Sequence, residues 1–207
     1  MTKEELIREI TAYFHERIPF NTLLGIEVLE ASGRQVVLRL PMKPDLVGNT
    51  HHGILHGGVT ATLLDVAGGL AAMINTIEKL TETETGLVRK RLQNIGTIDM
   101  RVDYLLPGLG HEFFATAEVV RHGQRVAVTR MQMRSERDKV IALGTATYMV
   151  GLGANPRSSK DPMLLKSLVI EQGFGLFPLS ADGGMVIEEE PAETVFVRPF
   201  RHLSLIG

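Results

Sequence analysis

The 207-residue sequence contains no cysteine. It therefore offers no disulfide scaffold, no thiolate nucleophile and no cysteine-ligated zinc site. An excess of one charge is also missing, because the formal net charge is -2. This gives no reason to expect a nucleic acid or an anionic membrane as a partner. The absences exclude the disulfide-rich, the thiol-dependent and the strongly charged classes of protein.

A long uninterrupted hydrophobic run is lacking as well. Residues 1–5 are mostly charged or polar and lack the apolar core of a signal peptide. The longest apolar run, residues 59–74, contains Asp65 and a pair of glycines and is too short to span a bilayer. Hydrophobic residues still make up 44% of the chain, with a mean hydropathy of +0.09, which is enough for a core. We expect a soluble, cytoplasmic protein without a membrane partner.

The beginning of the chain has the pattern of an amphipathic helix. Thr2 and Glu5 have the spacing of a capping box. Apolar residues then recur at helical spacing from Leu6 to Phe14. The sequence predicts an N-terminal helix that reaches about residue 17 and ends at Pro19.

Apolar segments bounded by turn residues predict an antiparallel sheet. In residues 97–105, apolar side chains from Ile98 to Tyr104 alternate with charged ones, which predicts one inward and one outward face. A loop over residues 43–55 leads into the long apolar helix, around which we expect the sheet to wrap. The expected strands are residues 26–31 and 35–40, which form a hairpin, and residues 97–105, 113–121, 125–133 and 140–150, which form a meander.

Two segments depart from this α+β pattern. Residues 78–93 are rich in Thr, Glu, Lys and Arg and have the character of an exposed excursion. Beyond residue 151 the chain becomes rich in Gly, Ser, Pro and Asn and shows no sustained period. We expect one domain over residues 1–151, and a C-terminal extension, residues 152–207, without chemistry of its own.

The most informative segment is HHGILHGG at residues 51–58, which leads directly into the apolar helix with its one acid, Asp65. Glycines where a helix begins leave backbone N–H groups open to a ligand, at the end where the helix dipole favours negative charge. A carboxylate in an apolar helix is costly to bury without a partner. A carbonyl oxygen on these N–H groups and a water molecule at Asp65 would make a hydrolase. A structural acid beside an ordinary helix start is the alternative.

Gly68 and Gly69 lie in the middle of this helix, where each costs about 1 kcal/mol relative to alanine. Close approach of another backbone or of a ligand would justify them. Strands at the edges of the expected sheet also tend to pair with another chain. Both observations favour a dimer in which the two helices lie close together.

Three histidines, His51, His52 and His56, lie close together in the sequence. His52 and His56 are four residues apart, which is a metal-ligand spacing on a helix. No glutamate follows as in the H-E-x-x-H pattern, and no third ligand is evident. We do not expect a metal site.

The motif from Leu55 to Gly58, followed by Asp65, resembles that of the PaaI-type acyl-CoA thioesterases, which have the hotdog fold. Further blocks resemble the YigI-type medium/long-chain acyl-CoA thioesterases over roughly residues 1–151, in order and in register. The resemblance implies hydrolysis of acyl-CoA to free fatty acid and CoA in fatty acid metabolism, with CoA as part of the substrate and no cofactor. The blocks are PFN at 19–21, VGN at 47–49, ILHGG at 54–58, LDVA at 64–67, GTID at 96–99, RVDYL at 101–105 and ATYMVG at 146–151.

The resemblance also implies roles for five residues. Asp65 would activate water or attack the thioester carbonyl directly, and either route requires a strong local base or nucleophile. The backbone N–H of Gly57 would polarise the thioester oxygen. His56 and Asn49 would orient the thioester and the water, and the Thr97 hydroxyl would hold the water.

The resemblance further implies a homodimer or homotetramer with each site at a dimer interface, where Gly57 of one chain faces Asp65 of the other. The two positions are about 12 Å apart along one helix, which is too far to hold one carbonyl. The acyl chain is expected in an apolar tunnel beside the helix and Met100, Val102 and Tyr104. Weak candidates for contacts with CoA are Gly58, Arg89, Lys90, Arg91, Arg121 and Arg125.

Three other functions compete with hydrolysis. A non-catalytic module that binds or senses acyl-CoA would keep the pocket but would not need Asp65. A hydratase or dehydratase of the same fold would want a histidine and an acid that bracket the α and β carbons of the acyl group, and no such pair is apparent beyond His56 and Asp65. A purely structural dimer would leave Asp65 unexplained.

Overall fold

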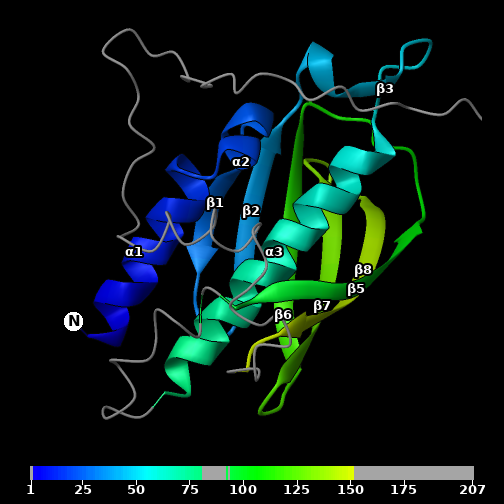
Figure 1. The fold of residues 1–207 in the computed structure, drawn as a ribbon. Coiled ribbons are helices and arrows are strands. Elements are labelled where there is room, and N and C mark those ends of the chain that lie inside the picture. The colour runs from blue at the N-terminus through cyan, green and yellow to red at the C-terminus, as the bar shows by residue number, and fades with distance from the viewer. Residues whose placement is uncertain (1, 81–91, 93, 152–207) are drawn as a thin grey trace, which may run out of the picture. The chain divides into compact units, whose positions relative to one another are not determined.

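The computed structural model describes residues 2–80, 92 and 94–151, which all fall within one compact unit. A six-stranded antiparallel sheet curves around helix α3 (Gly57–Glu78) (Figure 1). This confirms the expected α+β architecture. The strands, in the order in which they pair, are β1 (Glu27–Ala31), β2 (Val36–Pro41), β6 (Glu112–His122), β7 (Val126–Ser135), β8 (Val140–Met149) and β5 (Gly96–Tyr104).

The N-terminal helix, α1 (Lys3–Glu16), begins as the sequence predicts. The hydroxyl of Thr2 accepts a hydrogen bond from the Glu5 N–H, and the Glu5 carboxylate accepts one from the Thr2 N–H. These two bonds satisfy donors that would otherwise be unpaired at a helix start. The buried side chains of α1 include Leu6, Ile10 and Phe14, and the helix packs against α3.

A second short helix follows, which the sequence pattern did not predict. Pro19 ends α1 as expected but is also the first residue of α2 (Pro19–Leu24), where its fixed φ suits a helix start. The buried Asn21 amide donates a hydrogen bond to the Phe14 carbonyl and so ties α2 to α1. Six residues are too few to show a helical period.

The segment before α3 is also more ordered than the loop predicted for residues 43–55. It contains a short 3-10 helix, η1 (Pro44–Leu46), and a two-stranded hairpin of β3 (Val47–Asn49) and β4 (Ile54–Leu55). Strands of two or three residues carry no alternation that a sequence could reveal. The hairpin leads directly into α3 and fixes how that helix begins.

The predicted meander of four strands is wrong for β5. Strands β6, β7 and β8 pair in sequence order, but β5 pairs with β8 and lies at the sheet edge. The chain between β5 and β6 therefore passes the end of the sheet beneath the start of α3, where Leu55 donates to the Gly108 carbonyl. Strand order depends on this long-range pairing, which local periodicity does not encode.

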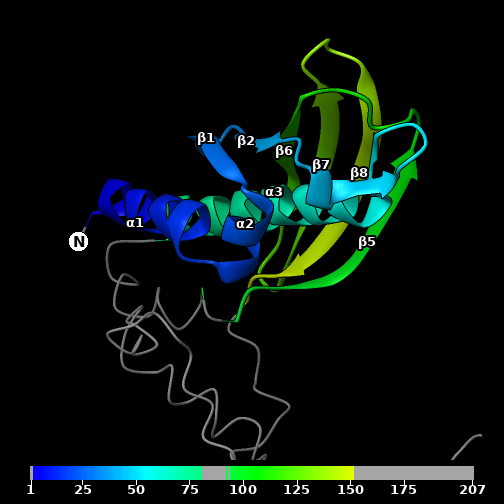
Figure 2. The ribbon, with the colours of Figure 1, turned by 90° about the horizontal axis from the view of Figure 1, so that it is seen from above.

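Helix α3 fills the concave side of the sheet (Figure 2). Its Leu63, Leu64, Leu70 and Ile74 are fully buried. The inward positions of β8 include small residues such as Gly144, which leave room for these larger side chains. By length and composition α3 could cross a membrane, but in this fold it is the core helix, and no other helix of the described chain meets that criterion.

Candidate active site

The start of α3 presents one free backbone donor. His56 is the N-cap, and its Nδ1 accepts a hydrogen bond of 2.9 Å from the Gly58 N–H. The His56 carbonyl accepts the N–H groups of Val59 and Thr60. Over residues 2–80, 92 and 94–151, the Gly57 N–H has no acceptor. This amide is therefore available to a ligand at the positive end of the helix dipole.

The Gly57 backbone is held from strand β5. The hydroxyl of Tyr104 donates a hydrogen bond of 2.8 Å to the Gly57 carbonyl. A Cβ on Gly57 would lie 3.4 Å from the Tyr104 ring, an ordinary contact distance. Tyr104, which is also expected beside the acyl chain, thus holds the backbone at the start of α3.

The β3–β4 hairpin brings Asn49 and His56 to the same end of α3. A Cβ on Gly48 would lie 2.6 Å from the Cα of His56, so the two backbones touch. The Asn49 side chain accepts a hydrogen bond of 3.1 Å from the His51 N–H and thereby shapes the hairpin turn. Asn49 and His56 are both exposed.

Asp65 lies about two turns further along α3 and is partly buried. The Thr97 hydroxyl donates a hydrogen bond of 2.9 Å to Asp65 Oδ1. The Tyr148 hydroxyl lies 3.1 Å from the same oxygen and 2.9 Å from the Asp65 main-chain carbonyl. The structure thus places Thr97 beside the acid and adds Tyr148, which the sequence did not single out.

A β-bulge in β5 explains why Thr97 faces the helix. Thr97 pairs with Tyr148 of β8, and the next pair is Asp99 with Thr147, so Ile98 is an extra residue on this strand. The bulge reverses the alternation and turns Thr97, instead of Ile98, toward α3. The prediction that Ile98 points inward is therefore wrong, and its side chain is 57% exposed.

Tyr148 could have been found from its surroundings in the sequence. It lies at an inward position of an alternating strand, and a buried tyrosine hydroxyl usually has a hydrogen-bond partner. Burial, followed by the charge of Asp65 and the hydrogen bond to it, raises the pKa of Tyr148. The hydroxyl therefore stays protonated and acts as a donor to the acid.

The structure gives Gly68 a different reason from the predicted one. A Cβ at Gly68 would lie 2.5 Å from the Tyr148 hydroxyl and 2.9 Å from Thr129 Oγ1. The close neighbours are thus side chains of the same chain's sheet, and neither a second backbone nor a ligand is needed to explain this glycine. At Gly69 a Cβ would meet the Tyr148 ring at 3.5 Å, an ordinary contact.

The candidates for CoA contacts are dispersed. Arg121 and Arg125 are exposed at the β6–β7 hairpin, where the adjoining His122 lies 3.0 Å from Thr76 Oγ1, near the C-terminal end of α3. Gly57 is about 28 Å from Thr76 along the helix, so one chain does not bring these arginines to the free amide. Gly58 is exposed beside that amide, whereas Arg89, Lys90 and Arg91 lie outside the described residues.

The described part of the chain contains no group of three His, Asp or Glu side chains that could hold a metal ion. His51 and His52 are exposed in the β3–β4 turn, and His56 uses its ring to cap α3.

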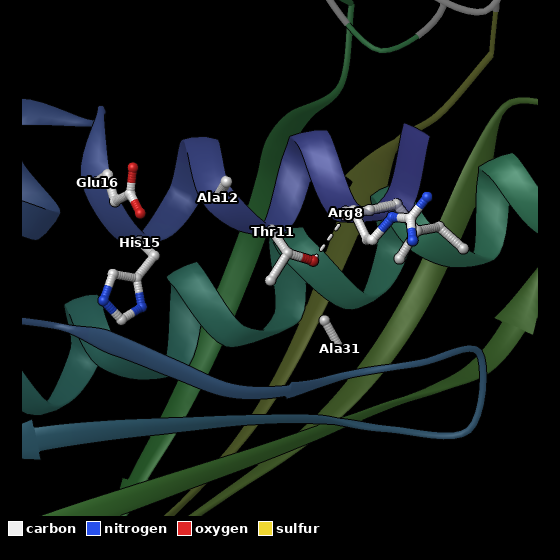
Figure 3. Close-up of a pocket in the computed structure, with 7 residues that line it drawn as sticks. Arg8, Thr11, Ala12, His15, Glu16 and Ala31 are labelled. Atoms are coloured by element: carbon white, nitrogen blue, oxygen red, sulfur yellow. Dashed lines mark hydrogen bonds between the residues drawn. The ribbon is translucent and has the colours of Figure 1, made fainter. Parts of the chain in front are cut away.

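A hollow of about 380 Å³ lies elsewhere, between α1 and β1 (Figure 3). None of the predicted site residues lines it. Its lining residues are Ile7, Arg8, Thr11, Ala12, His15, Glu16 and Ala31.

The chain is similar to known thioesterases. The family model described as thioesterase superfamily matches residues 52–142. The medium/long-chain acyl-CoA thioesterase YigI of Escherichia coli (strain K12) is 41% identical over 151 residues, which are 73% of this chain and 97% of YigI.

Solved structures show the same fold. A crystal structure of a Shewanella oneidensis protein related to the thioesterase superfamily has 45% identity and a TM-score of 0.68, over 72% of this chain and 97% of that one. The Escherichia coli PaaI protein shares the fold at 19% identity, with a TM-score of 0.57 over 72% of this chain and 96% of PaaI. The chain therefore belongs to the thioesterase superfamily and has its hotdog fold.

Proposed function

We propose that this protein hydrolyses medium- and long-chain acyl-CoA thioesters to a free fatty acid and CoA. The observation that carries the proposal is a partly buried carboxylate, Asp65, held by two hydroxyls on the helix that also carries the free Gly57 amide. The identity of 41% to an acyl-CoA thioesterase, almost all of which this chain covers, supports the substrate class.

The proposed chemistry uses Asp65 as the base or the nucleophile. As a base, its carboxylate takes a proton from water while the water oxygen bonds to the carbonyl carbon. As a nucleophile, it bonds to that carbon itself, and water then hydrolyses the anhydride. In both routes the C–S bond breaks. In the base route the proton that Asp65 took from water passes to the leaving CoA sulfur; in the nucleophile route CoA leaves as a thiolate and takes the proton released when water hydrolyses the anhydride. Negative charge develops on the carbonyl oxygen, where the Gly57 N–H stabilises it.

The remaining site residues have supporting roles in this proposal. The Thr97 hydroxyl donates a hydrogen bond to Asp65 and accepts one from the attacking water. Asn49 and His56 orient the thioester beside Gly57. The acyl chain lies along α3 beside Met100, Val102 and Tyr104. The reaction needs no cofactor, because water and the protein supply every group that it uses. The substrate class fits a cytoplasmic role in fatty acid metabolism, with neither nucleic acid nor membrane as a partner.

A dimer completes the site in this proposal. Gly57 and Asp65 are about 12 Å apart along α3, so one chain does not hold one carbonyl between them. Two antiparallel α3 helices would bring Gly57 of each chain to Asp65 of the other. A closed twofold assembly contains two such sites, and a tetramer contains four.

The test is thiol release from a ladder of acyl-CoAs, butyryl to palmitoyl, by wild type and Asp65→Asn. We expect release by wild type with a preference for medium and long chains, and a loss of about 10³-fold in kcat for the variant. Asp65→Asn keeps the size of the side chain, and circular dichroism checks its fold. Tight binding of acyl-CoA without release by either protein would instead establish the alternative, a binding or sensing module.

A further inference from the structure

We infer that Tyr148 is a positioning residue of this site. Together with Thr97 it holds Oδ1 of Asp65, which leaves Oδ2 as the oxygen that acts on water or on the thioester. The inference rests on the proposed role of Asp65 in hydrolysis. It adds a residue, and an atom of the acid, that the family resemblance did not supply.

The hydroxyls of Thr97 and Tyr148 reach the same oxygen of Asp65. Thr97 and Tyr148 are direct partners in the β5–β8 ladder, so their side chains leave the same face of the sheet. Their hydroxyls lie 2.9 Å and 3.1 Å from Oδ1 of Asp65. No group of the described chain donates a hydrogen bond to Oδ2. The acid is thus fixed through one oxygen while the other stays open.

Tyr148 contacts both the backbone and the side chain of Asp65. Its single hydroxyl proton is shared between the main-chain carbonyl at 2.9 Å and Oδ1 at 3.1 Å. These two contacts hold the rotamer of the Asp65 side chain and also the position of the Asp65 backbone relative to β8. Such preorganisation lowers the cost of reaching the reactive geometry.

Helix α3 leaves room for the Tyr148 hydroxyl at Gly68. Gly68 is one turn beyond Asp65, and any side chain there would meet the Tyr148 oxygen at 2.5 Å. Gly69 does not have this function, because a Cβ there would lie 3.5 Å from a ring carbon of Tyr148. The two adjacent glycines therefore give a matched pair of substitutions, since each change to alanine favours the helix by about the same amount.

Tyr148→Phe tests the inference, because it removes the hydroxyl and keeps the buried ring. We expect kcat for thiol release to fall about tenfold while KM changes less than about twofold, since a hydrogen bond to a charged group is lost only at the acid. Gly68→Ala should cause a similar fall in kcat by displacing the hydroxyl, and Gly69→Ala should not. The double variant Tyr148→Phe/Gly68→Ala should lose no more than either single variant.

The outcomes separate this inference from the proposed function. Full kcat in Tyr148→Phe, with Asp65→Asn inactive, would overturn the positioning role and leave the hydrolytic function standing. Equal losses in Gly68→Ala and Gly69→Ala would also overturn it, because the hydroxyl would then not be the cause. A rise in KM with unchanged kcat would make Tyr148 merely structural. Absence of thiol release from the wild type would overturn the proposed function and this inference with it.

Discussion

The two halves of the candidate site, both on α3, are built by different means. At the start of the helix the proposed catalytic group is a backbone amide, that of Gly57, which a short hairpin with His56 as cap leaves free. Two turns later the proposed catalytic group is a side chain, that of Asp65, which accepts hydrogen bonds from hydroxyls on two paired strands. The first half depends on local sequence, and the second depends on the register of a sheet.

This difference has a consequence for mutation. A backbone donor tolerates a new side chain but not the loss of its hydrogen, whereas the acid tolerates little change in what surrounds it.

After Asp65→Asn, the largest effect is expected for Gly57→Pro, which removes the N–H. Proline is well suited to the first residue of a helix, and the extended backbone of His56 (φ -64°, ψ 133°) suits a following proline. We expect kcat to fall by about 10²- to 10³-fold, as for loss of an oxyanion donor. Gly57→Ala is the control, because it keeps the N–H and meets the Tyr104 ring only at 3.4 Å. Equal losses in the two variants would show that space, instead of the amide, matters at this position.

A smaller effect is expected at the other half of the site. Thr97→Val keeps the shape of the side chain and removes the hydroxyl that donates to Asp65. We expect a loss of about tenfold in kcat, measured by thiol release at saturating acyl-CoA. Thr97→Ser should retain most of the activity, since it keeps the donor. A valine variant as active as wild type would remove Thr97 from the site.

Away from the site, Thr2→Ala should change stability and not catalysis. The variant loses the capping box of α1, and the free energy of unfolding should fall by about 1 kcal/mol in urea denaturation. The kcat should stay at the wild-type value. A loss of activity in the folded variant would show that α1 contributes to the site.

No effect on catalysis is expected from removing the C-terminal extension. The chain covers 97% of YigI with 151 residues, so a protein that ends at Gly151 should contain the whole catalytic domain. We expect its kcat and KM for acyl-CoA to match those of the full chain within about twofold. A drop in kcat beyond that would assign a function to residues 152–207 and overturn the domain boundary that the sequence predicts.

The contrast between the two halves also explains what the sequence could reveal. The capping box, the hairpin of β1 and β2 and the buried helix that carries Gly57 and Asp65 follow from local patterns and motifs. The place of β5 at the sheet edge and the inward turn of Thr97 do not, because each depends on the β5–β8 pairing and its bulge. The alternation of β8 predicts that Tyr148 points inward, but its contact with Asp65 depends on how the sheet packs on α3. Gly68 is costly in the middle of a helix, and only the contact with Tyr148, from a strand distant in sequence, explains it.

In the proposed dimer, the Gly57 amide of one chain and Asp65 of the other form one catalytic site. A site shared in this way can be tested by co-expressing Asp65→Asn and Gly57→Pro chains with different tags and purifying the mixed assembly through both tags. Each protein alone should be nearly inactive. The mixed dimer should recover about half of the wild-type rate of thiol release, because one of its two sites combines native Gly57 with native Asp65. A mixed dimer as inactive as its parents would show that Gly57 and Asp65 of different chains do not form one site.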